Sequence, residues 1–240
     1  MFQIFRNRSF QAILAYLLMQ VGGAFLASFL VLFSGIDEYV ALIYTNISVF
    51  IIGLVIIFLL LREELLIERK ENPLTIGRII LWSVVGIILA YLGQMFAVMI
   101  EINILDVKLG SDNTDLIVKL SEMNILFLLL PALIGPIIEE LVFRKALFGS
   151  LAKKINLHVA AVISALIFSL IHFDFEHTLI YFVMGLVFTF LYVQTKRIII
   201  PILAHMGMNS LAVISQLLIG PEEIERLREQ IAFILLGGWL

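Results

Sequence analysis

The sequence predicts an all-α protein, a polytopic membrane helix bundle of seven spans with a short eighth span as a further candidate. First, 62% of its 240 residues are hydrophobic and only 15% are charged, whereas soluble domains are about 45–50% apolar. Second, apolar runs of about 20 residues, the length that a helix needs to cross a bilayer, recur along the chain. A soluble fold of this length cannot bury so much apolar surface, so we expect lipid as its solvent.

The composition also excludes several classes of function. The chain contains no cysteine, which rules out disulfides, thiolate nucleophiles and cysteine-ligated zinc sites. Its net charge is −3, so it lacks the basic field that nucleic-acid binding requires. We therefore expect membrane lipid as a partner and no nucleic acid, and any chemistry must come from Glu, His, Asn, Ser or Lys side chains.

The first apolar run, residues 10–33, is predicted to be a retained membrane span. Arg6 and Arg8 precede it, in the way that basic residues precede the apolar region of a signal peptide. A signal peptide, however, has an apolar region of only about 7–15 residues, followed by a cleavage site of small residues. This run is longer and ends in Ser-Gly-Ile-Asp without such a site.

The remaining elements follow from the other apolar runs. The six further predicted spans are residues 39–61, 79–100, 124–151, 157–173, 178–194 and 198–219. A last run, 231–240, would be only about 15 Å long as a helix, too short to cross unless it extends back into 226–230. The longest polar connection, 101–122, is predicted to be partly helical and interfacial. No repeat or linker is visible, so residues 1–240 form one integral membrane domain.

The connections alternate in charge, which is the third observation behind this fold class. The basic connections contain Arg6 and Arg8, then Arg62, Arg69, Lys70 and Arg78, then Lys153 and Lys154, then Lys196 and Arg197. The acidic connections contain Asp37 and Glu38, residues 101–122, Asp174 and Glu176, and residues 222–229. Lys and Arg concentrate in cytoplasmic loops. We therefore expect a plasma-membrane protein with a cytoplasmic N-terminus.

Two adjacent glutamates and an arginine interrupt the fourth span. An ionisable residue inside a membrane is costly and indicates a functional site unless a partner explains it. Glu140 and Arg144 are four residues apart, so they share a helix face and can pair, while Glu139 points about 100° away. Glu139 is then a free carboxylate and a candidate general base. The alternative is a purely structural ion-pair network of all three residues.

Polar residues on two later spans reach a similar depth. Glu139 lies 14 residues before Lys153 and His172 lies 14 residues after His158. On an antiparallel helix pair both side chains would then be about 21 Å from the shared turn, so we expect them to face each other. On the last span, His205 and Asn209 share a face. Each histidine, taken singly, also fits an ordinary interhelical hydrogen bond, and His158 and His177 are interpreted as interfacial.

These side chains allow three kinds of chemistry. In a hydrolase, Glu139 would deprotonate a water, His172 would position it, and His205 with Asn209 would stabilise an oxyanion. In a zinc hydrolase, a glutamate and the histidines would bind the metal, with Glu139, His172 and His205 as its ligands. In a proton-coupled carrier, the same groups would relay protons. The chain lacks the H-E-x-x-H helix that would favour zinc.

Three short patterns in order along the chain carry a resemblance to a known family. They are E-E-x-x-x-R at Glu139, Glu140 and Arg144, F-x-x-x-H at Phe168 and His172, and H-x-x-x-N at His205 and Asn209. Each pattern alone is weak, but together, on predicted spans, they resemble the CPBP family. That family comprises type II CAAX prenyl endopeptidases, bacteriocin-processing enzymes and abortive-infection-like membrane proteins. The resemblance covers a catalytic core of about residues 124–219.

The resemblance implies an α-helical intramembrane endopeptidase whose substrate is a membrane-associated, CAAX-like or leader peptide. By the same resemblance, the positions of Glu139 and His172 activate water, and those of His205 and Asn209 form the oxyanion site. Support comes from the remaining motif residues, Glu140, Arg144 and Phe168. The mechanism that the family implies requires no metal. A non-catalytic immunity or scaffold protein and, less favoured, a proton-coupled carrier remain as alternatives.

Overall fold

The described secondary structure is entirely helical, which confirms the all-α class. The structure is a computed structural model, and it describes residues 7–107, 110–219, 223, 226, 227 and 230. Its main helices are α2 (Arg8–Ser34), α3 (Glu38–Glu71), α4 (Ile76–Asn103), α5 (Asp112–Met123), α8 (Leu157–Leu170), α9 (Thr178–Thr195) and α10 (Ile199–Leu218). Between α5 and α8 runs a central helix of several short segments. Each predicted span therefore has its helix.

Five described helices have the length and hydropathy to cross a membrane. They are α2, α3, α4, the central helix Ile125–Leu151, and α9. The other two predicted spans correspond to shorter apolar helices, α8 and the apolar stretch Ile199–Ser215 of α10. The candidate eighth span, 231–240, lies outside the described residues. The polar connection 101–122 does contain a helix, α5, whose Ser111 side chain accepts a hydrogen bond from the Thr114 N–H at its start.

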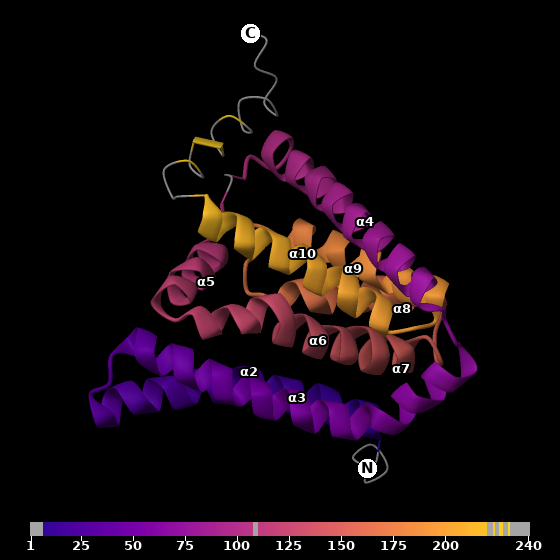
Figure 1. Ribbon diagram of the computed structural model, residues 1–240, viewed down its shortest axis with the longest axis horizontal. Helices are drawn as coiled ribbons and strands as arrows, with labels where there is room; N and C mark the ends of the chain where they lie inside the picture. The colour runs from indigo at the N-terminus through magenta and orange to yellow at the C-terminus, as the bar shows by residue number, and fades with distance from the viewer. Residues whose placement is uncertain (1–6, 108–109, 220–222, 224–225, 228–229, 231–240) are drawn as a thin grey trace.

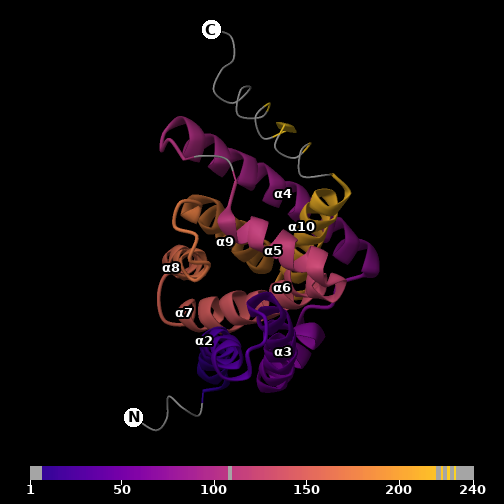
Figure 2. The ribbon, with the colours of Figure 1, turned by 90° about the vertical axis from the view of Figure 1, so that its left-hand side faces the viewer.

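The helices surround the central one on several sides. Figure 1 shows α2 and α3 side by side along one edge of the molecule, with α4 on the opposite side and α8, α9 and α10 between them. Seen from the end in Figure 2, α5 lies across the bundle. The largest buried apolar side chains in the middle include Ile138, Phe143, Phe168, Phe188 and Leu191. The apolar side chains of α2 and α3 that point away from the bundle are exposed, as lipid-facing residues must be.

Connections of like charge meet at the same end of the bundle. At one end, which we call the basic end, the Arg197 guanidinium donates to the backbone carbonyl of Asn72 at 2.8 Å. At the other, the acidic end, the Ser111 hydroxyl donates to the Asp174 carboxylate at 2.6 Å. These contacts join loops far apart in the sequence, in agreement with the alternation of charge along the chain.

The central helix changes its winding several times. A 3₁₀ turn (η1, Ile125–Leu128) leads into a π-helical turn (η2, Leu130–Ile134), then α6 (Gly135–Glu139), a longer π-helical segment (η3, Glu140–Phe148) and α7 (Gly149–Leu151). π-helical turns inside membrane or soluble helices are rare and are frequently found at functional sites. Glu139 is the last residue of α6 and Glu140 is the first residue of η3, so the helix changes its winding between these two adjacent glutamates.

Helix α8 is shorter than the sequence indicated. It ends at Leu170, whereas the predicted span continued to residue 173. Phe173 adopts a left-handed backbone conformation, with φ of 54°, and such a conformation terminates a right-handed helix. His172 therefore lies in the turn after the helix, which is a correction to its expected place inside the span.

Candidate active site

Glu140 is completely buried and is held on both of its oxygens. Oε2 lies 3.1 Å from the Arg144 Nε, and Oε1 lies 3.0 Å from the His205 Nδ1. The Glu140–Arg144 pair that the spacing indicated is therefore present, with a third member from α10. Arg144 lies 4.3 Å from the centre of the Phe168 ring and its Nη2 donates to the Gly185 carbonyl at 3.5 Å. Removing the guanidinium would leave Glu140 charged in an apolar interior.

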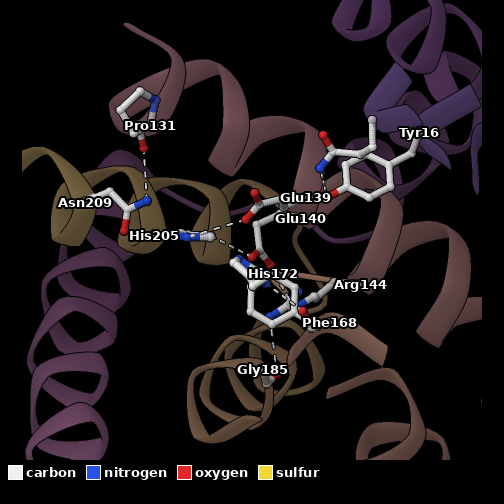
Figure 3. A network of polar contacts seen from close by, with 11 residues as sticks. Tyr16, Pro131, Glu139, Glu140, Arg144, Phe168, His172, Gly185, His205 and Asn209 are labelled. Carbon is white, nitrogen blue, oxygen red and sulfur yellow. Dashed lines mark hydrogen bonds and ion pairs between the residues drawn. The ribbon is translucent and has the colours of Figure 1, made fainter. Parts of the chain in front are cut away.

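Glu139 is less buried than Glu140, and fewer groups contact its carboxylate oxygens. Its side chain is 17% exposed, and the distance from its Oε2 to the His205 Nε2 is 3.8 Å. That separation is within ion-pair range but too long for a hydrogen bond. Figure 3 shows the two glutamates diverging from one turn of the central helix, with His205 beside both. Glu139 thus keeps acceptor positions available on the cavity side.

His205 lies between the two glutamates, with one ring nitrogen facing each. Its ring stacks on Phe188, with centroids 4.5 Å apart, which fixes the ring plane. Nδ1 faces Glu140 and Nε2 faces Glu139. An ionised carboxylate can only accept hydrogen bonds, so the Nδ1 that lies 3.0 Å from the Glu140 Oε1 must carry a hydrogen.

His172 is held by the turn that ends α8. Its Nδ1 lies 2.7 Å from the Phe168 carbonyl, and since a carbonyl only accepts, Nδ1 must carry the hydrogen. In the neutral ring, Nε2 is then an acceptor. The ring stacks on Tyr181 with centroids 4.1 Å apart. Of the two histidines, it is His205 that comes within ion-pair distance of Glu139, while Glu139 and His172, which were expected to face each other, line the same cavity.

Asn209 satisfies a carbonyl that the central helix cannot. Gly135 donates its N–H five residues back, to the carbonyl of Leu130. The next bond in this pattern would run from Pro136 to Pro131, but proline has no N–H. The Asn209 Nδ2 donates to that Pro131 carbonyl at 3.0 Å. One amide hydrogen of Asn209 is therefore committed to structure and the second remains for other uses.

One cavity joins these groups. It has a volume of about 620 Å³ and is lined by Glu139, His172, His205 and Asn209. Its wall also includes Tyr16 and Gln20 of α2, Asn46 of α3 and Gln94 of α4, and it continues to Glu101, Asp174 and His177 at the acidic end. The structure thus brings the four predicted site residues together around one cavity. Helices α2, α3 and α4, which contain no motif, also contribute to its wall.

A second buried histidine closes the acidic end. His177 Nδ1 lies 2.9 Å from the Glu101 Oε2, and its Nε2 contacts the Gly110 carbonyl. Burial alone would lower the pKa of His177, but the hydrogen bonds to Glu101 and Gly110 and the negative charge of Asp174 raise it above the usual value. The sequence placed this residue at the interface; the structure buries it.

Two residues that line the cavity, Tyr16 and Gln20, were not predicted from the sequence. Tyr16 and Gln20 lie one turn apart on α2, and the Gln20 Nε2 donates to the Tyr16 hydroxyl at 3.0 Å. A glutamine inside an apolar span is a polar group that needs a partner, so Gln20 carried a usable signal. His177 carried less, because a histidine next to Asp174 and Glu176 reads equally well as a solvated loop residue.

The residues do not assemble the zinc site that the sequence left open. Across the described part of the chain, no three His, Asp or Glu side chains gather closely enough to hold a metal ion. His172 directs Nδ1 to the Phe168 carbonyl and leaves Nε2 without a protein partner among the described residues, an arrangement that metal ligands and general bases share.

The fold and the cavity define a class of protein: a membrane-embedded helical protein with a glutamate and two histidines around one intramembrane chamber. Residues 121–211 match the family described as type II CAAX prenyl endopeptidase Rce1-like. The chain is 38% identical over 195 residues to a Bacillus subtilis (strain 168) protein named as membrane peptidase YdiL, covering 80% of this chain and 79% of that one. It is 35% identical over 213 residues to the membrane-embedded CAAX protease MroQ of Staphylococcus aureus (strain USA300), covering 84% and 85%.

A third relative matches over a shorter stretch. The UPF0177 protein YxdF of Lactococcus lactis subsp. lactis (strain IL1403) is 33% identical over 78 residues, which is 32% of this chain and 42% of that protein. No solved structure gives a significant match to the chain. On the two long matches, the chain belongs to the Rce1-like family of CAAX-type membrane proteases.

Proposed function

We propose that the chain is an intramembrane endopeptidase in which Glu139 and His172 activate a water molecule. One observation carries this proposal: Glu139 is a carboxylate inside the bundle that keeps acceptor positions facing a cavity, while its neighbour Glu140 is fully paired. A free carboxylate beside an imidazole acceptor is the arrangement that general-base catalysis requires. The names of the long relatives, a membrane peptidase and a CAAX protease, support the same reaction class.

The reaction would use the named side chains in sequence. Glu139 takes one proton of the water, whose oxygen attacks the scissile carbonyl carbon, while the Nε2 of His172 accepts a hydrogen bond from the second proton. The oxyanion that forms is stabilised by the Nε2–H of His205 and the second amide hydrogen of Asn209. The proton held by Glu139 then passes to the leaving nitrogen as the C–N bond breaks. No metal is required in this scheme.

The substrate class is supported by the family and by the place of the site. The family match and the CAAX protease relative point to a peptide or protein substrate such as a CAAX-like tail or a leader peptide, and a cavity inside the bundle suits a membrane-associated segment. We also propose a plasma-membrane location with a cytoplasmic N-terminus, on the alternation of basic and acidic loops.

The decisive experiment compares cells that express the wild-type chain with cells that express Glu139→Gln. Mass spectrometry of membrane and secreted peptides should find products that require Glu139, while detergent-solubilised protein from both cultures shows equal folded yield. An identical product set in both cultures would overturn the peptidase and favour a binding or carrier protein. Cleavage of an identified product precursor by purified enzyme should persist after chelation, with no stoichiometric metal in elemental analysis. Loss of activity that added zinc restores would replace the metal-free mechanism.

A further inference from the structure

Tyr16 of α2 is built into the site although no motif includes it. Its side chain is 2% exposed, and its ring packs edge to face on Phe143, with centroids 5.5 Å apart. Phe143 packs in the same way on Phe168 at 5.1 Å, and Phe168 contacts the His172 ring at 4.7 Å. A continuous row of aromatic rings therefore fixes the position of Tyr16 relative to the histidine of the site.

The hydroxyl of Tyr16 has a free hydrogen. A tyrosine hydroxyl can donate one hydrogen bond and accept others. Its oxygen accepts from the Gln20 Nε2 at 3.0 Å, and among the described residues no acceptor receives its hydrogen. Figure 3 shows the ring on the α2 side of the site with its hydroxyl end toward Glu139. Tyr16, Gln20 and Glu139 line the same cavity, and the charge of Glu139 acts on the Tyr16 phenol.

The two groups that hold the proposed water are both acceptors. Glu139 accepts through its carboxylate, and neutral His172 accepts through Nε2, since Nδ1–H is committed to the Phe168 carbonyl. Together they engage both hydrogens of a water but neither of its lone pairs. The oxygen can then still rotate about the axis that the two acceptors define. A single donor on one lone pair would fix the other lone pair in direction.

We propose that the Tyr16 hydroxyl is this donor and that it is a catalytic residue of the peptidase. With Glu139 and His172 accepting and Tyr16 donating, the water has three protein partners, the usual number for a buried water. Its remaining lone pair is directed at the substrate carbonyl. Gln20 is a positioning residue, because its amide holds the Tyr16 oxygen and turns the hydroxyl hydrogen toward the water. This inference rests on the proposed function.

The test uses Tyr16→Phe, which keeps the aromatic packing and removes only the hydroxyl. In cells, the products that depend on Glu139 should fall by about 10²-fold, the loss expected when a reacting group is no longer held in place. Tyr44→Phe is the matched control, because Tyr44 is 59% exposed on α3 and lies outside the cavity. It should give wild-type product levels.

Kinetics separate a catalytic from a structural role. With the precursor of the most abundant Glu139-dependent product as probe, in proteoliposomes, Tyr16→Phe should lower kcat and leave KM within about twofold, since the hydroxyl acts on the water and not on the peptide. Gln20→Leu should lower kcat in the same direction by a smaller factor. Thermal unfolding should be similar for wild type, Tyr16→Phe and Tyr44→Phe.

The outcomes distinguish this inference from the proposed function. If Glu139→Gln removes products and Tyr16→Phe leaves kcat unchanged, the role of Tyr16 is overturned and the peptidase stands. A rise in KM at constant kcat would also overturn it, because that pattern marks uniform substrate binding. If no product depends on Glu139, both proposals fall together. A Tyr16→Phe protein that does not fold shifts the decision to Gln20→Leu, where an unchanged kcat overturns the role.

Discussion

The buried glutamates at the two ends of the bundle differ from Glu139 in the middle by how fully their oxygens are used. At the basic end, Glu68 accepts from Lys145 Nζ at 2.6 Å, Tyr192 hydroxyl at 3.0 Å and Ile198 N–H at 2.6 Å. At the acidic end, Glu101 binds the His177 ring and accepts from the Ile180 N–H at 3.3 Å. Among the described residues, Glu139 has one contact within ion-pair distance, to the His205 Nε2 at 3.8 Å.

In our proposal, this difference separates the structural carboxylates Glu68 and Glu101 from the catalytic carboxylate Glu139. Ile198 and Ile180 lie at the starts of α10 and α9, where unpaired N–H groups and the helix dipole favour a negative charge. Glu68 and Glu101 therefore each hold the first turn of another helix. Burial alone does not mark a functional acid in this protein. What marks it is unused acceptor capacity that faces a cavity.

The largest effect on this comparison is expected from Arg144→Ala, which would remove one of the two side chains that hold Glu140. The Glu140 Oε2 would lose its contact with the Arg144 Nε and stay inaccessible to water, while only the His205 Nδ1 would remain beside Oε1. Breaking a buried pair from one side costs about 3–5 kcal/mol, a large part of the stability of a typical domain. We expect little folded protein in detergent, as measured by size-exclusion yield and thermal unfolding.

Arg226→Ala is the matched control for that change. Arg226 pairs with Glu223 at 3.3 Å, but both side chains are more than half exposed, and surface pairs contribute little. Its folded yield should equal that of the wild type. A well-folded Arg144→Ala protein would show that Glu140 does not depend on the guanidinium for support.

A smaller effect is expected from Glu68→Gln. Both oxygens of this carboxylate accept hydrogen bonds, and it takes no part in the proposed chemistry. The amide keeps the shape but loses the charge that pairs with Lys145 and one of the acceptor oxygens. Leaving buried donors without an acceptor costs about 1–3 kcal/mol. The melting temperature should fall, while kcat per folded molecule stays at the wild-type value. Glu63→Gln, at an exposed pair with Arg8, should change neither quantity.

The smallest effect should come from the acidic end through pH. The pKa of His177 is raised above its usual value of 6.5, so its contact with Glu101 contributes fully below pH 6.5. That contribution is lost as the pH rises through the raised pKa. The protection factors for amide exchange at Ile180 and Ser111, which divide out the base-catalysed intrinsic rate, should therefore fall at alkaline pH, and His177→Gln should flatten this dependence.

His158 provides the control for the pH experiment. It lies in the first turn of α8 and is exposed, so His158→Gln should keep the wild-type pH profile of amide exchange. If the protection factors of Ile180 and Ser111 do not depend on pH in the wild-type protein, His177 does not hold the acidic end together.

Much of the fold was predictable because the bilayer imposes a length. Spans of about 20 apolar residues and alternating loop charge located each helix, and the helix α5 in the polar connection was expected. The end of α8 at Leu170 was not predictable, because the residue that adopts the left-handed conformation after it is Phe173 and not a glycine. The change of winding in the central helix was also missed, although Pro131 and Pro136 flank its first π-helical turn.

The candidate site was predictable to the extent that its residues stand out in an apolar sequence. Glu139, Glu140, Arg144 and the two histidines are visible for that reason. Tyr16 is not, because an aromatic side chain in a span reads as ordinary packing. Which histidine approaches which glutamate depends on the relative rotation of helices, and spacing along the chain does not determine that rotation.

The absence of one hydrogen atom, at the nitrogen of Pro136, sets the alignment of two distant parts of the chain. It leaves the Pro131 oxygen as a fixed docking point on the central helix, and the Asn209 amide binds there. His205 stands one turn earlier on α10, so this bond, together with the Ser210 hydroxyl that donates to the Ala132 carbonyl at 3.5 Å, limits how far α10 can slide along its neighbour. A shift of one residue would move the imidazole about 1.5 Å, enough to part it from Glu140. Pro136 thus helps to set the position of α10 relative to the central helix, although it contributes no side chain to the proposed chemistry.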